Sequence, residues 1–353
     1  MLDIAIVEGL RTPFVKAFGP LASVPAQELG QLAVVGVLGR SSIQPNRVDQ
    51  VVIGNVATPP DAANIARVIA LMAGIPQDRI AHTVSRNCAS GMEAITTAAR
   101  LLQLKEAGLV IAGGTESMSR IPLLYNAEAT AQFLRLGRAK NWRQRLVSLL
   151  GFRPRHFRPV PGVKLGLTDP VCGLIMGETA EILAKEFGIT RQEQDEYALE
   201  SHRRAAAAQE RGVLAEEITP VPVDGTGQEI RQDLGPRKDQ SLEALARLRP
   251  YFRQDGTVTV GNSCPITDGA GAVVVMPGAE ARAGARPLLG YLRAYAYAGC
   301  DPKRMGLGPI FATSKVLELT GLGMSDFDLI EMNEAFAAQV LANLRAFASD
   351  RFA

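Results

Sequence analysis

The sequence predicts an α/β layered fold with two core halves and an inserted loop domain. Apolar segments with strand character alternate with helical ones over residues 1–120, and the same alternation returns over residues 250–353. Such alternation is typical of sheets covered by helices. The intervening residues 121–249 differ, because they combine several prolines and basic residues with a long polar helical run. We therefore expect these three ranges to be the domains of the chain.

The first half opens on a strand-like segment, Asp3–Glu8, and two later apolar segments, Val51–Gly54 and Leu109–Ala112, have the length of buried strands. Ala62–Ala73 has helical spacing. No apolar run approaches the roughly 20 residues that a bilayer-spanning helix needs. Because no charged leader precedes the first strand either, we expect a chain that is neither exported nor membrane-spanning.

The remaining segments follow the same logic. Glu178–Arg211 has the composition of a long polar helix. Beyond it, Thr257–Val260, Ala272–Met276 and Asp328–Glu331 are predicted strands of a second α/β unit.

Composition narrows the class of protein. A chain of 353 residues with 47% hydrophobic and 21% charged residues is ordinary for a globular protein of two or three domains. A net charge of +2 gives no reason to expect nucleic-acid binding. The four cysteines have neither disulfide-framework nor metal-ligand spacing, so we expect free thiols, no metal site and a cytoplasmic location.

Cys88 is the candidate nucleophile. It lies between the strand-like Ile80–Ser85 and a segment, Ala94–Leu102, with apolar residues at helical spacing. A thiol at a helix N-terminus is favoured as the reactive thiolate by the free N–H groups and the helix dipole. From the residues alone, Cys88 is equally well interpreted as a small buried apolar side chain.

Seven motifs give the chain a resemblance to thiolases, and they occur in the order of that family. The resemblance is closest to the fatty-acid-oxidation branch, the β-subunit type of the trifunctional complexes. The motifs are Arg11–Phe14, Asn87–Gly91, Gly113–Ser119, Met176–Glu181, Gly261–Ser263 with Asp268–Ala270, Met305–Pro309 and Asn333–Gln339.

The resemblance implies a five-layered αβαβα architecture and the activity of a 3-ketoacyl-CoA thiolase in fatty-acid β-oxidation. Cys88 would accept the acyl group as a thioester, and coenzyme A would be the co-substrate, with no further cofactor. A homodimer is expected. A hydratase/dehydrogenase α-subunit is a further expected partner.

The second core half is expected to be incomplete. In the family, a Gly-His-Pro motif and a Cys-x-Gly-Gly-Gly motif follow the asparagine motif and supply two acid-base residues, and this sequence contains neither motif. An alternative interpretation is therefore a catalytically inactive thiolase-like protein that binds acyl-CoA or a partner. A third is condensation rather than cleavage.

Four further site residues follow from the resemblance. Asn333 would help to form an oxyanion hole, while Cys264, Met305 and Phe336 would contact the pantetheine and acyl chain of the substrate. Each has a plainer interpretation: Asn333 as the N-cap of a helix, Cys264 in a tight turn, Met305 and Phe336 as core residues. Glu116 is expected to be a structural carboxylate bound by backbone N–H groups.

Residues 129–168 form the most asymmetric charge pattern in the chain, with nine lysines and arginines and no acidic residue. Apolar residues recur every three or four positions from Phe133 to Leu149, which predicts a basic amphipathic helix. We expect such a surface to contact a membrane or the partner subunit. Two alternatives are capture of the phosphates of coenzyme A and a helix packed on its own protein.

Overall fold

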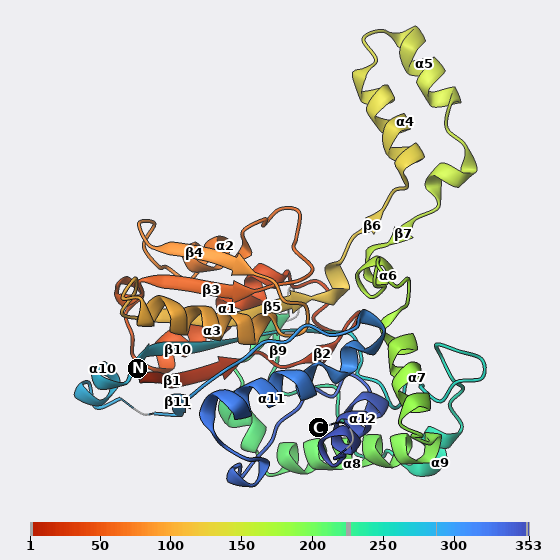
Figure 1. Ribbon diagram of the computed structural model, residues 1–353. Coiled ribbons are helices and arrows are strands. Elements are labelled where there is room, and N and C mark those ends of the chain that lie inside the picture. Colours follow the sequence, from red (N-terminus) through yellow and green to blue (C-terminus); the bar gives the residue numbers. More distant parts are fainter. Residues whose placement is uncertain (1–2, 224–226, 287, 351, 353) are drawn as a thin grey trace. The chain divides into compact units, whose positions relative to one another are not determined.

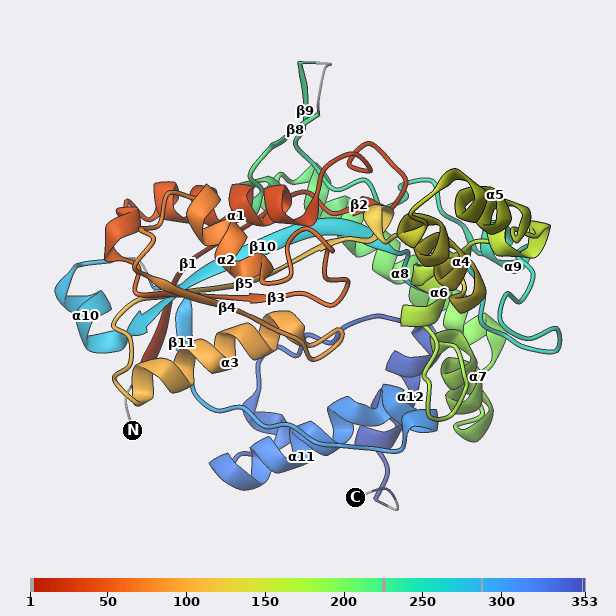
Figure 2. The same cartoon turned by 90° about the horizontal axis from the view of Figure 1, so that it is seen from above.

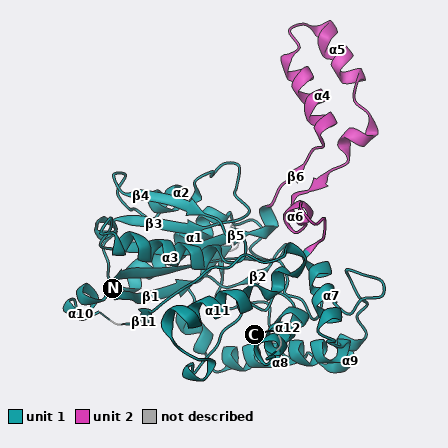
Figure 3. Cartoon of the chain, in the orientation of Figure 1, with its two compact units in different colours: residues 1–120, 176–353 teal, residues 121–175 magenta. Residues whose placement is uncertain are grey.

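The computed structural model describes residues 3–223, 227–286, 288–350 and 352. These residues form two compact units, a core unit made of residues 1–120 and 176–353 and a smaller unit made of residues 121–175 (Figure 3). The sequence had placed the loop domain at 121–249, whereas by contact residues 176–249 group with the core. The division into domains at residues 1–120, 121–249 and 250–353 remains a prediction.

One mixed sheet organises the core unit (Figure 1). In the described residues it has seven strands in the order β11-β1-β10-β5-β3-β4, with β2 paired to β10. β3 runs parallel to β4 and β5, whereas β10 is antiparallel to both β1 and β5. The strands are β1 (Ile4–Arg11), β2 (Val15–Lys16), β3 (Gln50–Gly54), β4 (Ile80–Val84), β5 (Val110–Ser117), β10 (Thr267–Pro277) and β11 (Gly290–Leu292).

Helices cover both faces of this sheet, as Figure 2 shows. α1 (Ala26–Arg40) and α2 (Ile65–Met72) pack on one face in a large apolar cluster. α3 (Ser90–Gln103) packs on the other face. Its buried Ala94, Ala98 and Leu102 recur every four residues, so one stripe of the helix faces the sheet. The predicted α/β layering of this half is confirmed.

The rest of the core unit is mostly helical. α7 (Met176–Glu186), the 3₁₀ segment η5 (Pro302–Leu307) and α12 (Ala337–Phe347) share a third apolar cluster. α8 (Arg191–Glu210) packs against α12. The other elements are η1 (Pro45–Arg47), η2 (Met118–Arg120), η4 (Val213–Glu217), β8 (Val221–Val223), β9 (Gln228–Ile230), α9 (Leu242–Ala246), α10 (Gly278–Ala283), α11 (Gly308–Thr320) and η6 (Met324–Asp326).

Three strand predictions for the second half need correction. Ala272–Met276 is a strand, but it belongs to β10 of the first sheet. Thr257–Val260 is a loop, because the Glu181 carboxylate accepts the N–H groups that a neighbouring strand would otherwise pair. Asp328–Glu331 forms no strand, since no described segment pairs with it, and Leu329 is 86% exposed. In the described residues the second half thus has helices but no sheet of its own.

The smaller unit contains a short ribbon of β6 (Leu123–Leu124) and β7 (Val160–Pro161). Its helices are α4 (Ala127–Arg138), α5 (Trp142–Leu150), η3 (Pro154–Phe157) and α6 (Gly162–Gly166).

The prediction of one amphipathic helix over Phe133–Leu149 is therefore wrong, since two helices occupy that range. The break follows from local chemistry. Ala139 has an extended backbone with ψ 118°, and Asn141 caps α5 by accepting a 2.9 Å hydrogen bond from the backbone N–H of Gln144. Among the described residues, none of the helices combines the length and the apolar character that crossing a bilayer requires.

Candidate active site

Cys88 lies in the turn that joins β4 to α3, two residues before the helix begins. The turn is closed by 3.0 Å hydrogen bonds from the N–H of Ala89 to the Arg86 carbonyl and from the N–H of Ser90 to the Asn87 carbonyl. Asn87 has a φ of 47°, a left-handed conformation that asparagine tolerates well. Cys88 itself is exposed and unpaired. The predicted placement of this residue beside a helix N-terminus is confirmed, while its role remains a proposal.

The turn rests closely on the sheet because β3 ends in Gly54. A Cβ atom at this position would collide with the backbone carbonyl of Ser90 and approach the Gly91 nitrogen to 2.8 Å. Only glycine therefore lets the N-terminus of α3 pack directly on the end of β3. The position of Cys88 is thus set by the sheet as well as by its own turn.

An ionic network lies next to this turn. The Glu93 carboxylate accepts hydrogen bonds from Arg86 at 2.6 Å and from Arg100 at 2.7 Å. Arg86 also lies over the ring of Tyr297, with its guanidinium carbon 3.9 Å from the ring centroid. Burial alone would raise the pKa of Glu93, but hydrogen bonds from Arg86, Tyr297 and Arg100 outweigh it and lower that pKa to about 2. The carboxylate is charged at any ordinary pH.

Two loops far apart in sequence meet at Cys264. The N–H of Cys264 donates to the Ala335 carbonyl at 2.9 Å, and the N–H of Ala337 donates to the Asn262 carbonyl at 3.0 Å. The Asn262 side chain ties this loop to α8 by donating to Asp195 Oδ1 at 3.0 Å. The loop of Cys264 is consequently held against the segment that contains Asn333.

Cys264 lies within electrostatic reach of Cys88. Burial raises the pKa of the Cys264 thiol, and the electrostatic influence of Cys88 adds to that rise. An electrostatic interaction of this kind requires that the two residues be neighbours. The structure therefore brings together two of the predicted site residues, Cys88 and Cys264, which are remote in sequence.

Asn333 is exposed and lies outside any helix or strand, shortly before α12. The alternative interpretation as a helix N-cap is wrong, because α12 begins at Ala337 and its N-cap residue is Phe336. Among the described residues the Asn333 side chain has no hydrogen-bond partner. By contrast, its neighbour Glu334 accepts hydrogen bonds from Tyr197 and Ser201 of α8, both at 2.6 Å. The amide of Asn333 is therefore available to a ligand.

Met305 and Phe336 differ in their surroundings. Phe336 packs on Phe252 with ring centroids 5.9 Å apart and borders the third apolar cluster, next to the loop of Cys264. Met305 lies in η5, where its carbonyl accepts a weak hydrogen bond from Cys300 Sγ at 4.0 Å. Among the described residues no hydrogen bond joins Met305 to Cys88 or Cys264.

Sequence reasoning missed the contributions of α8. Asp195, Tyr197 and Ser201 reach the loops of Cys264 and Asn333, yet nothing in a polar helix marks which residues face a site. Glu116, by contrast, behaves as expected, since its carboxylate accepts hydrogen bonds from the N–H groups of Val56 and Ala57. Within the described ranges no group of three or more His, Cys, Asp or Glu residues could hold a metal ion.

Comparison with known proteins decides the family. The model of the thiolase N-terminal domain matches residues 4–279, and that of the thiolase C-terminal domain matches residues 286–351. The chain belongs to the thiolase family. The resemblance predicted from the seven motifs is thereby confirmed. Thiolases are acyltransferases that use coenzyme A as a substrate and need no further cofactor.

Individual relatives agree with this assignment. The thiolase chain is 42% identical to a 3-ketoacyl-CoA thiolase of Serratia proteamaculans over 99% of its own length and 80% of the relative. It superposes on the acetyl-CoA acetyltransferase of Bacillus anthracis with a TM-score of 0.89 at 37% identity. On human mitochondrial 3-ketoacyl-CoA thiolase in complex with CoA, the TM-score is 0.86 at 35% identity. Each match to these two structures covers 99% of this chain and 84% of the other.

Proposed function

We propose that this thiolase cleaves a 3-ketoacyl-CoA with coenzyme A by way of a thioester on Cys88. The observation that carries the proposal is the position of Cys88. Its thiol is exposed at the N-terminal end of α3, beside the loop of Cys264, in a member of a family of acyltransferases. A nucleophile needs this combination of solvent access and an electropositive helix end.

The reaction requires two transfers at that sulfur. The Cys88 thiolate attacks the C3 carbonyl carbon of the substrate, and the bond between C2 and C3 then breaks. The acyl group remains on sulfur as a thioester, while acetyl-CoA leaves as an enolate and takes up a proton. The thiolate of a second coenzyme A attacks the thioester, which releases the shortened acyl-CoA and restores Cys88.

We assign Asn333 to stabilisation of an oxyanion in this reaction. Its exposed amide has no hydrogen-bond partner among the described residues, so both its N–H groups are free to donate. Cys264 and Phe336 would contact the pantetheine or acyl chain, since the two residues lie on paired loops. Met305 would contact the same substrate from η5.

Transfer of an acyl group to Cys88 tests the proposal directly. The protein is incubated with hexanoyl-CoA and digested, and the peptides are weighed by mass spectrometry. We expect the hexanoyl group on the peptide that contains Cys88 and its loss in Cys88→Ala. Cys172→Ala is a matched control, because Cys172 is another free cysteine and has no role in the proposal. Equal acylation of Cys88→Ala would overturn the assignment.

A second function, acyl-CoA or partner binding without turnover, is favoured by one observation. None of the three histidines, His82, His156 and His202, hydrogen-bonds to Cys88 in the part of the chain that the structure describes. A base normally activates a thiol nucleophile and contributes about 10²- to 10⁴-fold in rate. Calorimetric binding of coenzyme A without release of acetyl-CoA from 3-ketooctanoyl-CoA would favour this function.

We also propose a homodimer that forms through β4. This strand is an edge of the sheet, and Ile80 at its start is exposed. An unpaired edge strand is a template for pairing with a second copy. Light scattering after size exclusion should give twice the monomer mass. Thr83→Pro removes an N–H group from the edge strand and should lower the measured mass. A monodisperse monomer of the unmodified protein would contradict the dimer.

The smaller unit is our candidate for peripheral membrane contact in the cytoplasm. A crevice of about 460 Å³ between α4 and α5 is lined in part by Arg135, Arg138 and Arg143, and Trp142 and Leu150 are exposed nearby in sequence. Exposed apolar and basic side chains together favour anionic lipid surfaces. Flotation with phosphatidylglycerol vesicles, but not with phosphatidylcholine vesicles, should recover the protein. Recovery only with a hydratase/dehydrogenase α-subunit would assign this surface to that partner instead.

A further inference from the structure

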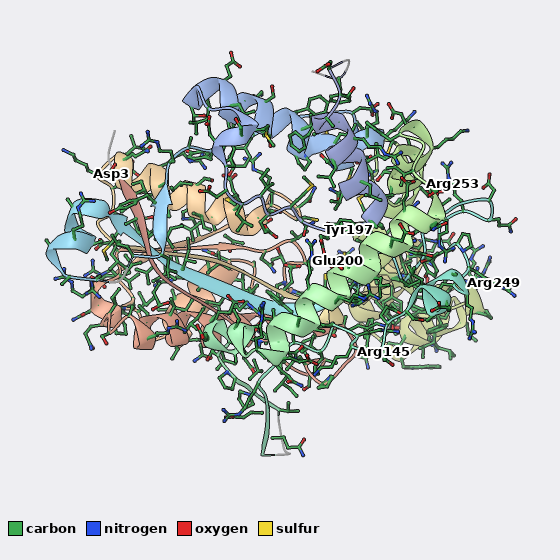
Figure 4. The ribbon with its side chains drawn as sticks, turned by 90° about the horizontal axis from the view of Figure 1, so that it is seen from below. Asp3, Arg145, Tyr197, Glu200, Arg249 and Arg253 are labelled. Carbon is green, nitrogen blue, oxygen red and sulfur yellow. The ribbon has the colours of Figure 1, made fainter. Side chains whose placement is uncertain are left out.

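α8 reaches the segment that contains Asn333 through one carboxylate. Tyr197 and Ser201 are four residues apart on this helix and therefore lie on the same face. Their hydroxyl groups donate to the two oxygens of Glu334, Tyr197 to Oε1 and Ser201 to Oε2, at 2.6 Å in each case. Figure 4 labels Tyr197 on this helix together with Glu200. Both oxygens of the carboxylate are thus engaged.

The other side of the same segment is held by backbone contacts. The Ala335 carbonyl accepts from the N–H of Cys264, and Phe336 forms a bridge with Ser263. Glu334 is consequently bound to α8 through its side chain, while the residues that follow it are bound to the loop of Cys264. Asn333 is the residue next to the carboxylate on its free side, so the direction of its amide depends on where Glu334 is held.

We propose that Tyr197 and Ser201 are positioning residues that fix Asn333 for the reaction by binding Glu334. The inference rests on the proposed function, in which Asn333 stabilises an oxyanion. Oxyanion donors are effective only when they are pre-organised. A displacement of such a donor by about 1 Å lowers the rate by on the order of 10²-fold.

The electrostatic surroundings support this arrangement. Burial and the neighbouring Glu334 carboxylate raise the pKa of Tyr197, so its hydroxyl remains a donor at all working pH values. Arg204 also interacts with both Tyr197 and Glu334. The negative charge of Glu334 also acts on His202, whose pKa is nevertheless lowered by burial and by Arg237. Arg204 thus places a positive charge near the carboxylate that the two hydroxyl groups bind.

Two kinetic measurements separate positioning from a merely structural role. Acetyl-CoA release from 3-ketooctanoyl-CoA reports the chemistry, and alkylation of Cys88 by iodoacetamide reports a reaction that needs no oxyanion donor. We expect Tyr197→Phe and Ser201→Ala to lower the maximal release rate about tenfold or more while the half-saturating concentration and the alkylation rate change less than about twofold. The double variant should resemble Glu334→Ala, since all act through one carboxylate.

Conservative and matched variants complete the design. Glu334→Gln retains an acceptor for Tyr197 and a polar partner for Ser201, so it should recover most of the rate lost in Glu334→Ala. Glu196→Ala is the matched control on the same helix, because Glu196 is exposed and bonds to Gln192 and not to Glu334. The proposal would be overturned if Tyr197→Phe and Ser201→Ala lowered the release rate and the alkylation rate by the same factor and also lowered the thermal midpoint. Tyr197 and Ser201 would then have a structural role only.

If the unmodified protein releases no acetyl-CoA, that result counts against the proposed function but not against the inference about Tyr197 and Ser201. Hydrogen exchange then tests the inference separately. Tyr197→Phe and Glu334→Ala should then speed amide exchange in a peptide covering residues 328–336 and leave the peptide of residues 80–104 unchanged. Unchanged exchange in residues 328–336 would show that α8 does not hold Asn333.

Discussion

Arg86 Nε lies 2.6 Å from Glu93 Oε2, so a single ion pair joins the turn of Cys88 to the first turn of α3. The Glu93 side chain is 9% exposed, and Arg100 binds its other oxygen. Removal of this carboxylate would leave two arginines without their acceptor. The pair therefore links the stability of the helix to the geometry of the candidate nucleophile.

The first prediction concerns Glu93→Gln. Loss of the charge-assisted hydrogen bonds from Arg86 and Arg100 should lower the free energy of unfolding by about 1.5–3 kcal/mol. Urea unfolding followed by circular dichroism measures the change. Glu106→Gln, at an exposed position, is the matched control. If Glu93→Gln lowered the free energy of unfolding no more than Glu106→Gln does, the ionic network would contribute little to stability.

The same carboxylate predicts a pH dependence. Its pKa is lowered in the folded protein, from an ordinary value of 4.5 to about 2, so its contribution is fully present above about pH 4.5 and is lost as the pH falls toward 2. The thermal midpoint of the native protein should decline over this window, and that of Glu93→Gln should decline less. Parallel curves for the two proteins would contradict the assignment.

Gly54 gives a prediction about packing. In Gly54→Ala the new methyl group meets the backbone of Ser90, which cannot rotate away as a side chain would. We expect a loss of about 1–3 kcal/mol in stability and slower acylation of Cys88, because the turn must move from the sheet. Gly39→Ala in α1 is the control, since nothing lies within 4 Å of its added Cβ atom. That variant should be neutral or slightly stabilised.

The first half of the fold and the position of Cys88 could be predicted because their signals are local. Buried strands such as β3 and the apolar stripe of α3 leave patterns that are visible within a few residues. Thr257–Val260 has the same β-branched alternation, yet a distant carboxylate, Glu181, satisfies its N–H groups. Local patterns contain no information about such a partner.

The candidate site was predictable only in part for the same reason. Family motifs proposed Cys88 and Asn333 as site residues, but the neighbours of Asn333 come from α8, whose polar sequence gives no sign of which side faces the loop. The N-cap interpretation of Asn333 failed because Ala335 and Ala337 make backbone hydrogen bonds with the loop of Cys264, which delays the start of α12. A tertiary contact there outweighs the local preference for capping.

Asn262 is predicted to be essential to the loop of Cys264. Its side chain donates to Asp195 and to the Thr257 carbonyl and accepts from the N–H of Thr259, and the residue is 2% exposed. Asn262→Ala leaves these partners buried without a hydrogen bond, which should cost about 1–3 kcal/mol in stability. Chemical denaturation measures this cost. If Asn262→Ala unfolded at the same midpoint as the unmodified protein, water would have replaced the hydrogen bonds of the Asn262 amide.

The coupling between the two thiols gives the last prediction. Burial and the electrostatic influence of Cys88 both raise the pKa of Cys264, so alkylation of Cys264 by iodoacetamide should become half-maximal above its ordinary pKa of 9.0. In Cys88→Ala one of these causes is gone, and the midpoint should move to lower pH. Peptide mass spectrometry resolves the two sites, and Cys172→Ala, whose thiol is not among the causes that shift the pKa of Cys264, should leave the Cys264 profile unchanged. An identical profile in Cys88→Ala would mean that Cys88 does not influence the titration of Cys264.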